Sequence, residues 1–386
     1  MIFFKKGRFC IVTVVVFSLC LVIYGYDKKM KILMVVPAFP KVHDVCMLNQ
    51  IIGLTQRGHD VWILANKAGD TSVLQEDVVR YNLLAKTIIG DFPDNLNDYD
   101  IVVFQLGHRA KNIKKTHNFT GKLIICLRGY DITGFIKANP HAYNDFFEDC
   151  DLFMPVCKFF RERLLALGCP ADKIVVHHSA IDCSRFVPSK NTLQKNKAIT
   201  IVSAGRFVEK KGFEYSIKAT AQLIKKYPQV RYVIIGDGVL KNKYKRLIKK
   251  LGVADRITLD TWHSHDEYIA ILDKAHIFVL SSVTAQNDDR EGVPNVLKEA
   301  MAMGLVVIAT DHSGNSELID DGVSGLLVPE RDCTALYRAI DKAIVTYNVL
   351  DTMRANAHKK VVQEFERERE NDTLETIFLS LLDTSL

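Results

Sequence analysis

The stretch ITIVSAGRFVEKKGFEYSIKATAQLIKKY, residues 199–227, contains a mostly apolar run, a loop with glycines and cations, and an amphipathic stretch. The run 199–205 has no polar alternation, as expected for a strand buried on both faces of a parallel sheet. Residues 214–227 have the apolar spacing of a helix. A strand followed by a helix is the unit of doubly wound α/β folds, in which ligands bind beyond the carboxyl ends of the strands. We therefore expect a ligand site in the loop 205–213.

The same alternation continues in both directions and predicts two doubly wound domains. Further apolar runs predict strands at 30–36, 60–65, 100–106, 122–127 and 151–156, and again at 230–238, 275–282, 305–310 and 325–329. The polar stretch 187–197 lacks periodicity and reads as a linker. We expect two Rossmann-like domains facing a cleft, with bounds 30–186 and 198–365, and a helical tail at 366–386.

Residues 9–26 form a run without any charge, bracketed by basic residues on both sides. The run is close to the length that crosses a bilayer, and no small-residue cleavage pattern follows it. This predicts a membrane anchor at residues 1–29. Because basic residues stand on both sides, the positive-inside rule leaves its orientation open.

The net charge of +6 comes mostly from the residues around this run, so it does not indicate nucleic-acid binding. The nine cysteines include no C-x-x-C pair, which argues against a zinc finger or a disulfide framework. Reduced thiols suit a catalytic part in the cytosol.

The stretch EGVPNVLKEAMAMG, residues 291–304, predicts a helix with Pro294 in its first turn and Gly304 after its end. Glu291 then lies in the preceding loop and Glu299 in the second turn. The N–H groups of Gly292 and Val293, together with the helix dipole, would form an anion site suited to a phosphate. Glu299 could accept hydrogen bonds from ribose hydroxyls and Glu291 from sugar hydroxyls. The plainer alternative is that Glu291 favours the helix N-terminus and Glu299 is solvated.

A second loop favours the ligand interpretation. Gly205 and Arg206 directly follow a predicted strand, and Lys211 lies just before a predicted helix. The arginine fork and the lysine point charge could both face a diphosphate. Arg206, Lys211 and the two glutamates make a fairly specific set on the loops of one domain.

The pattern G-R-x-x-x-K-K-G at 205–212, followed about eighty residues later by E-G-x-P-x-x-x-x-E at 291–299, resembles the retaining glycosyltransferases of family 4, which have the GT-B fold. The stretches 234–238 and 312–329 strengthen the resemblance, which runs from about residue 31 to the end. Within the family the chain is most similar to bacterial enzymes that build exopolysaccharides such as colanic acid and amylovoran, or lipopolysaccharide.

The resemblance implies a nucleotide-sugar donor, UDP-linked in our expectation, and a saccharide or lipid-linked acceptor at the membrane, with the catalytic part in the cytoplasm. It implies no metal and no cofactor. Arg206 and Lys211 would hold the diphosphate, Glu299 the ribose and Glu291 the transferred sugar; Arg206, Lys211 and Glu291 are the residues expected to act in catalysis. Gly205, Gly292 and Val293 would complete the donor site, with Asp237, Gly238, Trp262 and His263 near the base. Front-face attack, with the acceptor proton passing to a phosphate oxygen, would need no protein base, so Glu291 is not expected to be a nucleophile.

The chain departs from the family at the acceptor side. Many relatives have His-Gly-x-Asp where this chain has Arg128-Gly129-Tyr130-Asp131, and residues 43–45 also differ. Arg128 and Asp131 are expected to contact the acceptor or the sugar, but an arginine cannot act as a histidine would. A non-catalytic, membrane-tethered protein that binds sugar nucleotides or acts as a scaffold is therefore the alternative. An epimerase or a phosphorylase of the same fold is disfavoured by the anchor and by the 291–299 loop.

Overall fold

The computed structural model describes residues 28–41, 45–71, 74–107, 117–144, 146–188, 193 and 197–383. The anchor expected at residues 1–29 falls almost wholly outside this part of the chain, as do residues 43 and 44. Among the described residues, no helix combines the length and the apolar character needed to cross a membrane.

The N-terminal sheet has six parallel strands in the order β3-β2-β1-β4-β5-β6. They are β1 (Lys31–Val36), β2 (Asp60–Ala65), β3 (Thr87–Ile89), β4 (Ile101–Phe104), β5 (Lys122–Leu127) and β6 (Leu152–Pro155). The helices around it are α2 (Val45–Gln56), α3 (Glu76–Arg80), α5 (Gly134–Ala138), α6 (Phe146–Asp149) and α7 (Lys158–Ala166). The central strands are buried on both faces, which explains their continuous apolar runs.

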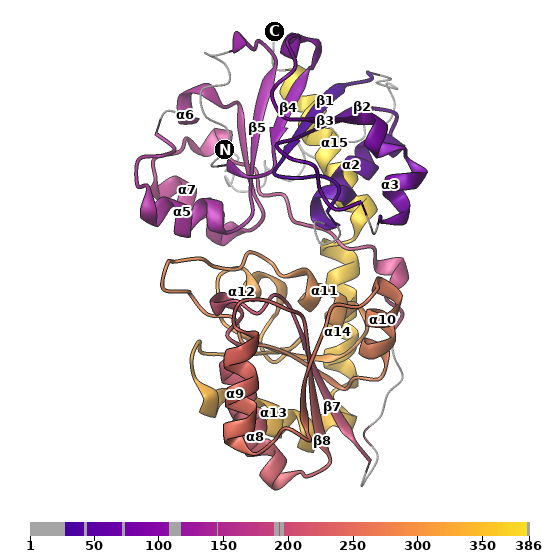
Figure 1. Ribbon diagram of the computed structural model, residues 1–386, viewed down its shortest axis with the longest axis vertical. Helices are drawn as coiled ribbons and strands as arrows, with labels where there is room; N and C mark the ends of the chain where they lie inside the picture. The colour runs from indigo at the N-terminus through magenta and orange to yellow at the C-terminus, as the bar shows by residue number, and fades with distance from the viewer. Residues whose placement is uncertain are drawn as a thin grey trace, which may run out of the picture.

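The C-terminal sheet repeats this plan in the order β12-β11-β10-β7-β8-β9, again with every pairing parallel. Its strands are β7 (Ile199–Ala204), β8 (Val230–Ile235), β9 (Ile257–Asp260), β10 (Ile277–Leu280), β11 (Val306–Thr310) and β12 (Leu326–Val328). Its helices are α8 (Phe213–Lys226), α9 (Lys241–Leu251), α10 (His265–Asp273), α11 (Asn295–Ala302), α12 (Asn315–Leu318), α13 (Cys333–Thr346) and α14 (Asp351–Glu364). The two parallel sheets lie in separate lobes, one above the other in Figure 1, and confirm the predicted pair of doubly wound folds.

Each predicted strand is present, but the apolar patterns failed to predict two further strands. The missed strands, β3 and β9, lie at sheet edges and are only three and four residues long. An edge strand is covered less completely, so its residues need not form an apolar run. The predicted strand 230–238 ends earlier, at Ile235, and the residues after it form a glycine loop.

The C-terminal helix α15 (Arg367–Asp383) crosses back to the first sheet, beside α2 (Figure 1). Its Leu374 and Phe378 are fully buried in the apolar core of that half. We call residues 28–186 together with α15 the N-lobe, and residues 197–364 the C-lobe. The chain passes between them twice at one place, where the N–H of Ile181 donates to the carbonyl of Phe365 (3.0 Å) and the N–H of Arg367 to that of Ile181 (2.9 Å).

Candidate active site

The predicted donor residues lie in the loops that follow four adjacent strands of the C-lobe. Gly205 and Arg206 follow β7, Asp237 and Gly238 follow β8, Trp262 and His263 follow β9, and Glu291, Gly292 and Val293 lie between β10 and α11. Carboxyl ends of parallel strands meet at one edge of the sheet. The topology therefore gathers residues up to 88 positions apart (205 to 293) at that edge.

The loops that follow β7 and β8 pack closely against each other beside Arg206, and both contain glycines. A Cβ at Gly236 (φ 151°) would lie 2.0 Å from the carbonyl oxygen of Gly205, and one at Gly238 would lie 2.7 Å from that of Phe207. The N–H of Phe207 also donates to the carbonyl of Asp237 at 2.7 Å. Only residues without a side chain allow this close approach. The exposed side chain of Arg206 is thus presented on a rigid base.

Lys211 and Glu291 form a buried ion pair with 3.0 Å between Nζ and Oε2. Lys210 lies 3.6 Å from the other carboxylate oxygen and 3.0 Å from Asp289. Burial would raise the pKa of Glu291, but Lys211 and Lys210 outweigh it and lower that pKa to about 2. Burial would lower the pKa of Lys210, but the carboxylates of Glu291 and Asp289 outweigh burial and raise that pKa. Oε1 of Glu291 is buried and has no hydrogen-bond partner among the described residues.

His312 and Glu330 hold the backbone of Glu291, and sequence analysis assigned neither. The N–H of Glu291 donates to Nε2 of His312 at 3.1 Å. Nδ1 of His312 lies 2.5 Å from Glu330, which also accepts the N–H of Thr284 at 2.8 Å. Because Nε2 accepts, Nδ1 must carry the proton and donate to Glu330. The available signal was a histidine two residues after a buried apolar strand, within a motif already noted for its resemblance.

Helix α11 begins at Asn295, one residue later than predicted, with Pro294 at the N-cap in an extended conformation. The N–H groups of Gly292 and Val293 have no acceptor among the described residues, as a phosphate site requires.

Glu299 is only 9% exposed, so the alternative that it is solvated is wrong. Burial raises its pKa to about 7, against opposing effects from Tyr268 and Lys298.

Lys298, which the sequence analysis placed in no role, is fully buried beside Glu299. Its ammonium donates to the carbonyl and to Oγ of Ser179 in the N-lobe, the latter at 2.9 Å, and to Oδ1 of Asn295 at 3.1 Å. It also lies 5.1 Å from the centre of the Phe365 ring. Burial lowers its pKa to about 8. α11 is thereby fastened to the place where the chain crosses between the lobes.

The residues expected near the base lie on the same edge but are engaged with their own neighbours. Asp237 is exposed and lies 2.8 Å from Lys241, and His263 lies 2.9 Å from Asp260. No contact joins Asp237 or His263 to Lys211 or Glu291 in the described part of the chain.

Arg128 points into the N-lobe. Its guanidinium donates to the side-chain oxygens of Gln50 (3.0 Å) and Gln105. Asp131 is buried and accepts the N–H groups of Arg128 (3.0 Å) and Gly129 (2.8 Å). Two glutamines therefore hold the guanidinium that stands where relatives have histidine, while its buried Nε has no hydrogen-bond partner among the described residues.

Gly129 brings this loop against residues 286–293, which we call the donor loop. A Cβ there would lie 3.1 Å from the carbonyl oxygen of Arg290, which directly precedes Glu291.

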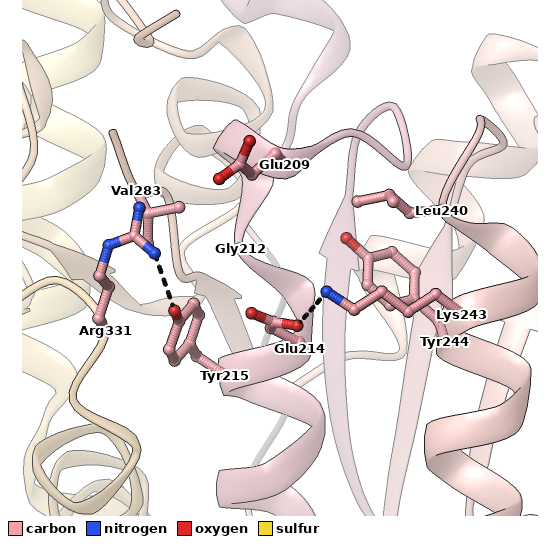
Figure 2. A pocket seen from close by; sticks show the side chains of 9 residues that line it. All are labelled: Glu209, Gly212, Glu214, Tyr215, Leu240, Lys243, Tyr244, Val283 and Arg331. Carbon is pink, nitrogen blue, oxygen red and sulfur yellow. Dashed lines mark hydrogen bonds and ion pairs between the residues drawn. The ribbon is translucent and has the colours of Figure 1, made fainter. Parts of the chain in front are cut away.

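Within the described residues, no three His, Cys, Asp or Glu side chains gather as metal ligands would. A small hollow opens beside the loop 205–212, between the first turns of α8 and α9 (Figure 2). Three of its four charged side chains pair with neighbours: Lys243 lies 2.6 Å from Glu214, and Arg331 donates to the hydroxyl of Tyr215 at 3.1 Å. We assign it no ligand.

Residues 186–360 match the family model described as glycosyl transferases group 1. The chain is 28% identical to the putative colanic acid biosynthesis glycosyltransferase WcaL of Salmonella typhimurium, over 91% of this chain and all of that protein. It is 29% identical to the amylovoran biosynthesis glycosyltransferase AmsK of Erwinia amylovora, over 80% of this chain and 89% of that one. Its fold is similar to that of HepE from Anabaena, solved with UDP-glucose, with a TM-score of 0.76 at 18% identity, covering 91% of this chain and all of that chain.

Proposed function

Because the chain belongs to the retaining glycosyltransferases of family 4, with the GT-B fold, we propose that it moves a sugar from a nucleotide-sugar donor to a saccharide acceptor in cell-surface polysaccharide biosynthesis. The names of WcaL and AmsK, which align along most of their length, support this process. UDP is the proposed nucleotide, because HepE, which shares the fold, was solved with UDP and with UDP-glucose.

The observation that carries the proposal is the edge of the C-lobe sheet, where Arg206, Lys211, Glu291 and Glu299 lie on loops and a helix around one helix N-terminus. Arg206 and Lys211 would stabilise the charge that develops on the departing diphosphate, together with the N–H groups of Gly292 and Val293. Lys211 and the two backbone N–H groups are held in place before the substrate arrives, so little reorganisation of these groups is needed during the reaction.

Glu291 would orient the transferred sugar and would not attack it. Its Oε2 is held by Lys211, while the buried Oε1 lacks a hydrogen-bond partner among the described residues. A buried acceptor without a donor is costly unless a ligand supplies one, and a sugar hydroxyl would do so. A phosphate oxygen of the leaving group would take the acceptor proton, with front-face attack retaining the configuration.

The proposed acceptor is lipid-linked and binds at the N-lobe, near Arg128 and Asp131. Both side chains are engaged inside the N-lobe: Asp131 accepts backbone N–H groups of its own loop, and Arg128 donates to Gln50 and Gln105. We propose that this loop contacts the acceptor mainly through backbone atoms and Tyr130, which is 46% exposed. The expected anchor would keep the enzyme beside such an acceptor.

The test is nucleotide-sugar binding by the full-length chain in mild detergent, against a panel of UDP-, GDP- and ADP-sugars. Selective binding should be lost in Arg206→Ala and in Glu299→Ala. Arg256→Ala and Glu364→Ala are matched controls, because these residues belong to the same lobe and lie outside the proposed site.

Absence of binding by the folded wild-type chain would contradict the proposal. Binding without any turnover in the presence of membrane acceptors would instead favour the non-catalytic alternative.

A further inference from the structure

Helix α7 of the N-lobe is capped by a residue of the C-lobe. Its N-cap residue is Cys157, whose side chain makes no capping hydrogen bond. The N–H groups of Lys158 and Phe159, which have no partner within the helix, donate to the two carboxylate oxygens of Glu317 at 2.8 and 2.9 Å. Glu317 lies on α12 of the C-lobe, across from α7 (Figure 1).

Glu317 is suited to this contact as an anion. Burial would raise its pKa, but His178 and the two backbone N–H groups outweigh burial and lower it. Its side chain is 15% exposed. Hydrogen bonds from a helix N-terminus to a charged carboxylate are stronger than those to a neutral group, and the helix dipole adds to them.

The same helix meets the donor loop at a second place. Arg163 on α7 lies 2.9 Å from Asp288, which also binds Arg290 at 2.8 Å. The guanidinium of Arg290 lies 5.4 Å from the centre of the Phe159 ring. α7 therefore touches the segment that directly precedes Glu291.

α12 is in turn packed against that segment. A Cβ at Gly314, the residue before α12, would lie 2.5 Å from the carbonyl oxygen of Gly292. Glu317 and the donor loop are thus held together in the C-lobe, and both contact α7. A change in the Glu317 contact can therefore reach the donor site through adjoining packed groups.

We propose that Glu317 is a positioning residue that latches the two lobes together by capping α7 across the interface. The latch fixes the N-lobe against the donor loop, as an enzyme must when it excludes water from an activated sugar. This inference rests on the proposed function for its purpose, but the contact it invokes can be tested separately.

The test is deuterium exchange on the full-length chain, read at two places: residues 157–161 on α7 and residues 286–293 in the other lobe. Glu317→Ala should speed exchange at least tenfold at both places. Glu317→Gln keeps one carbonyl oxygen as an acceptor, so its exchange rates should lie between those of Glu317→Ala and the wild type. Asp332→Ala is the matched control, because Asp332 caps α13 inside the C-lobe by accepting the N–H groups of Thr334 and Ala335. It should change exchange only around its own helix.

A second variant separates a latch from an ordinary helix cap. Cys157→Ser supplies α7 with a cap of its own. In the Glu317→Ala background it should restore protection at 157–161 and leave 286–293 exchanging fast. Recovery at both places would overturn the latch, as would a Glu317→Ala chain with unchanged exchange at 286–293.

Titration with UDP distinguishes this inference from the proposed function. The wild type and Glu317→Ala should bind UDP within about twofold of each other, a difference of only about 0.4 kcal/mol. Glu317 lies outside the donor set, and a loop whose rare opening becomes tenfold more frequent is still closed most of the time. A larger loss in the variant would mean that Glu317 belongs to the donor site and would overturn the latch. Failure of the wild type to bind UDP would count against the proposed function. The exchange experiment would still show whether Glu317 links the two lobes.

Discussion

Glu299 and Lys298 are neighbours on α11, and burial shifts the pKa of each toward neutrality, to about 7 and about 8. Burial opposes any charge, so the carboxyl group holds its proton more tightly and the ammonium less tightly. Glu299, which is proposed to hold the ribose, and its neighbour Lys298 can therefore both change protonation near neutral pH.

We predict that the affinity for UDP-glucose rises as pH rises through about 7. Ribose hydroxyls would donate to the ionised carboxylate, so binding favours loss of the Glu299 proton. Between pH 6 and 7.5, below the pKa of Lys298, the gain should be about fivefold to tenfold for a single site of this kind. Calorimetry with UDP-glucose, whose diphosphate does not titrate in this range, measures it. Glu299→Gln should bind UDP-glucose more weakly and lose the pH dependence. If the affinity of the wild type did not change between pH 6 and 7.5, the prediction would be contradicted.

The Lys211–Glu291 pair gives a second prediction at this scale. Removing one partner of a buried pair leaves an uncompensated charge, which destabilises by about 3 kcal/mol or more. Lys211→Met should therefore lower the free energy of unfolding at pH 7 by roughly that amount, with Lys210 limiting the loss. Lys211→Met combined with Glu291→Leu should recover most of it. Urea unfolding of the two single variants and the double variant tests this, and additive losses would rule out the pairing.

At the scale of elements, the docking of α15 on α2 depends on close approach. A Cβ at Gly53 of α2 would lie 2.1 Å from the side-chain nitrogen of Asn371 on α15. Asn371 is 2% exposed, so its amide has little room to move. Arg57 extends the contact through ion pairs to Glu368, Asp372 and Glu375.

We predict that Gly53→Ala loosens α15. Overpacking a buried contact typically destabilises by about 1 to 3 kcal/mol, and the C-terminal helix should become sensitive to protease at lower denaturant concentration. Asn371→Ala in the same chain makes room for the added methyl group and should restore much of the resistance. Equal sensitivity of Gly53→Ala and the wild type would show that the amide can move aside.

The elements themselves were largely predictable, because buried parallel strands leave continuous apolar runs. A helical tail was expected from residue 366, but its packing against the N-lobe was not predictable. Residues 352–382 have one continuous amphipathic pattern, and nothing in it indicates that Leu374 and Phe378 belong to a different core from Val361. Helical spacing shows which residues are buried but does not show against what they pack.

At the scale of the molecule, the predicted site loops do follow adjacent strands, because parallel topology fixes where strand ends meet. The contacts of Glu317 with α7, of Lys298 with Ser179 and of His312 with Glu291 were not predicted. Each joins a side chain to a segment that is distant in sequence or on another loop, so it depends on how whole elements dock. Local patterns contain no information about that docking.

The paired crossing at Ile181 and Phe365 makes the C-lobe an insert within the N-lobe, whose two ends leave and return side by side. A chain that joins residue 181 directly to residue 366 would excise the insert and keep every strand and helix of the N-lobe. We predict that this spliced chain, covering 28–181 and 366–383, unfolds in one cooperative transition monitored by circular dichroism. A chain cut after residue 186 lacks α15, leaves the apolar face of α2 bare, and should aggregate. We therefore expect the smallest folding unit of this protein to be built from two stretches that are separate in its gene.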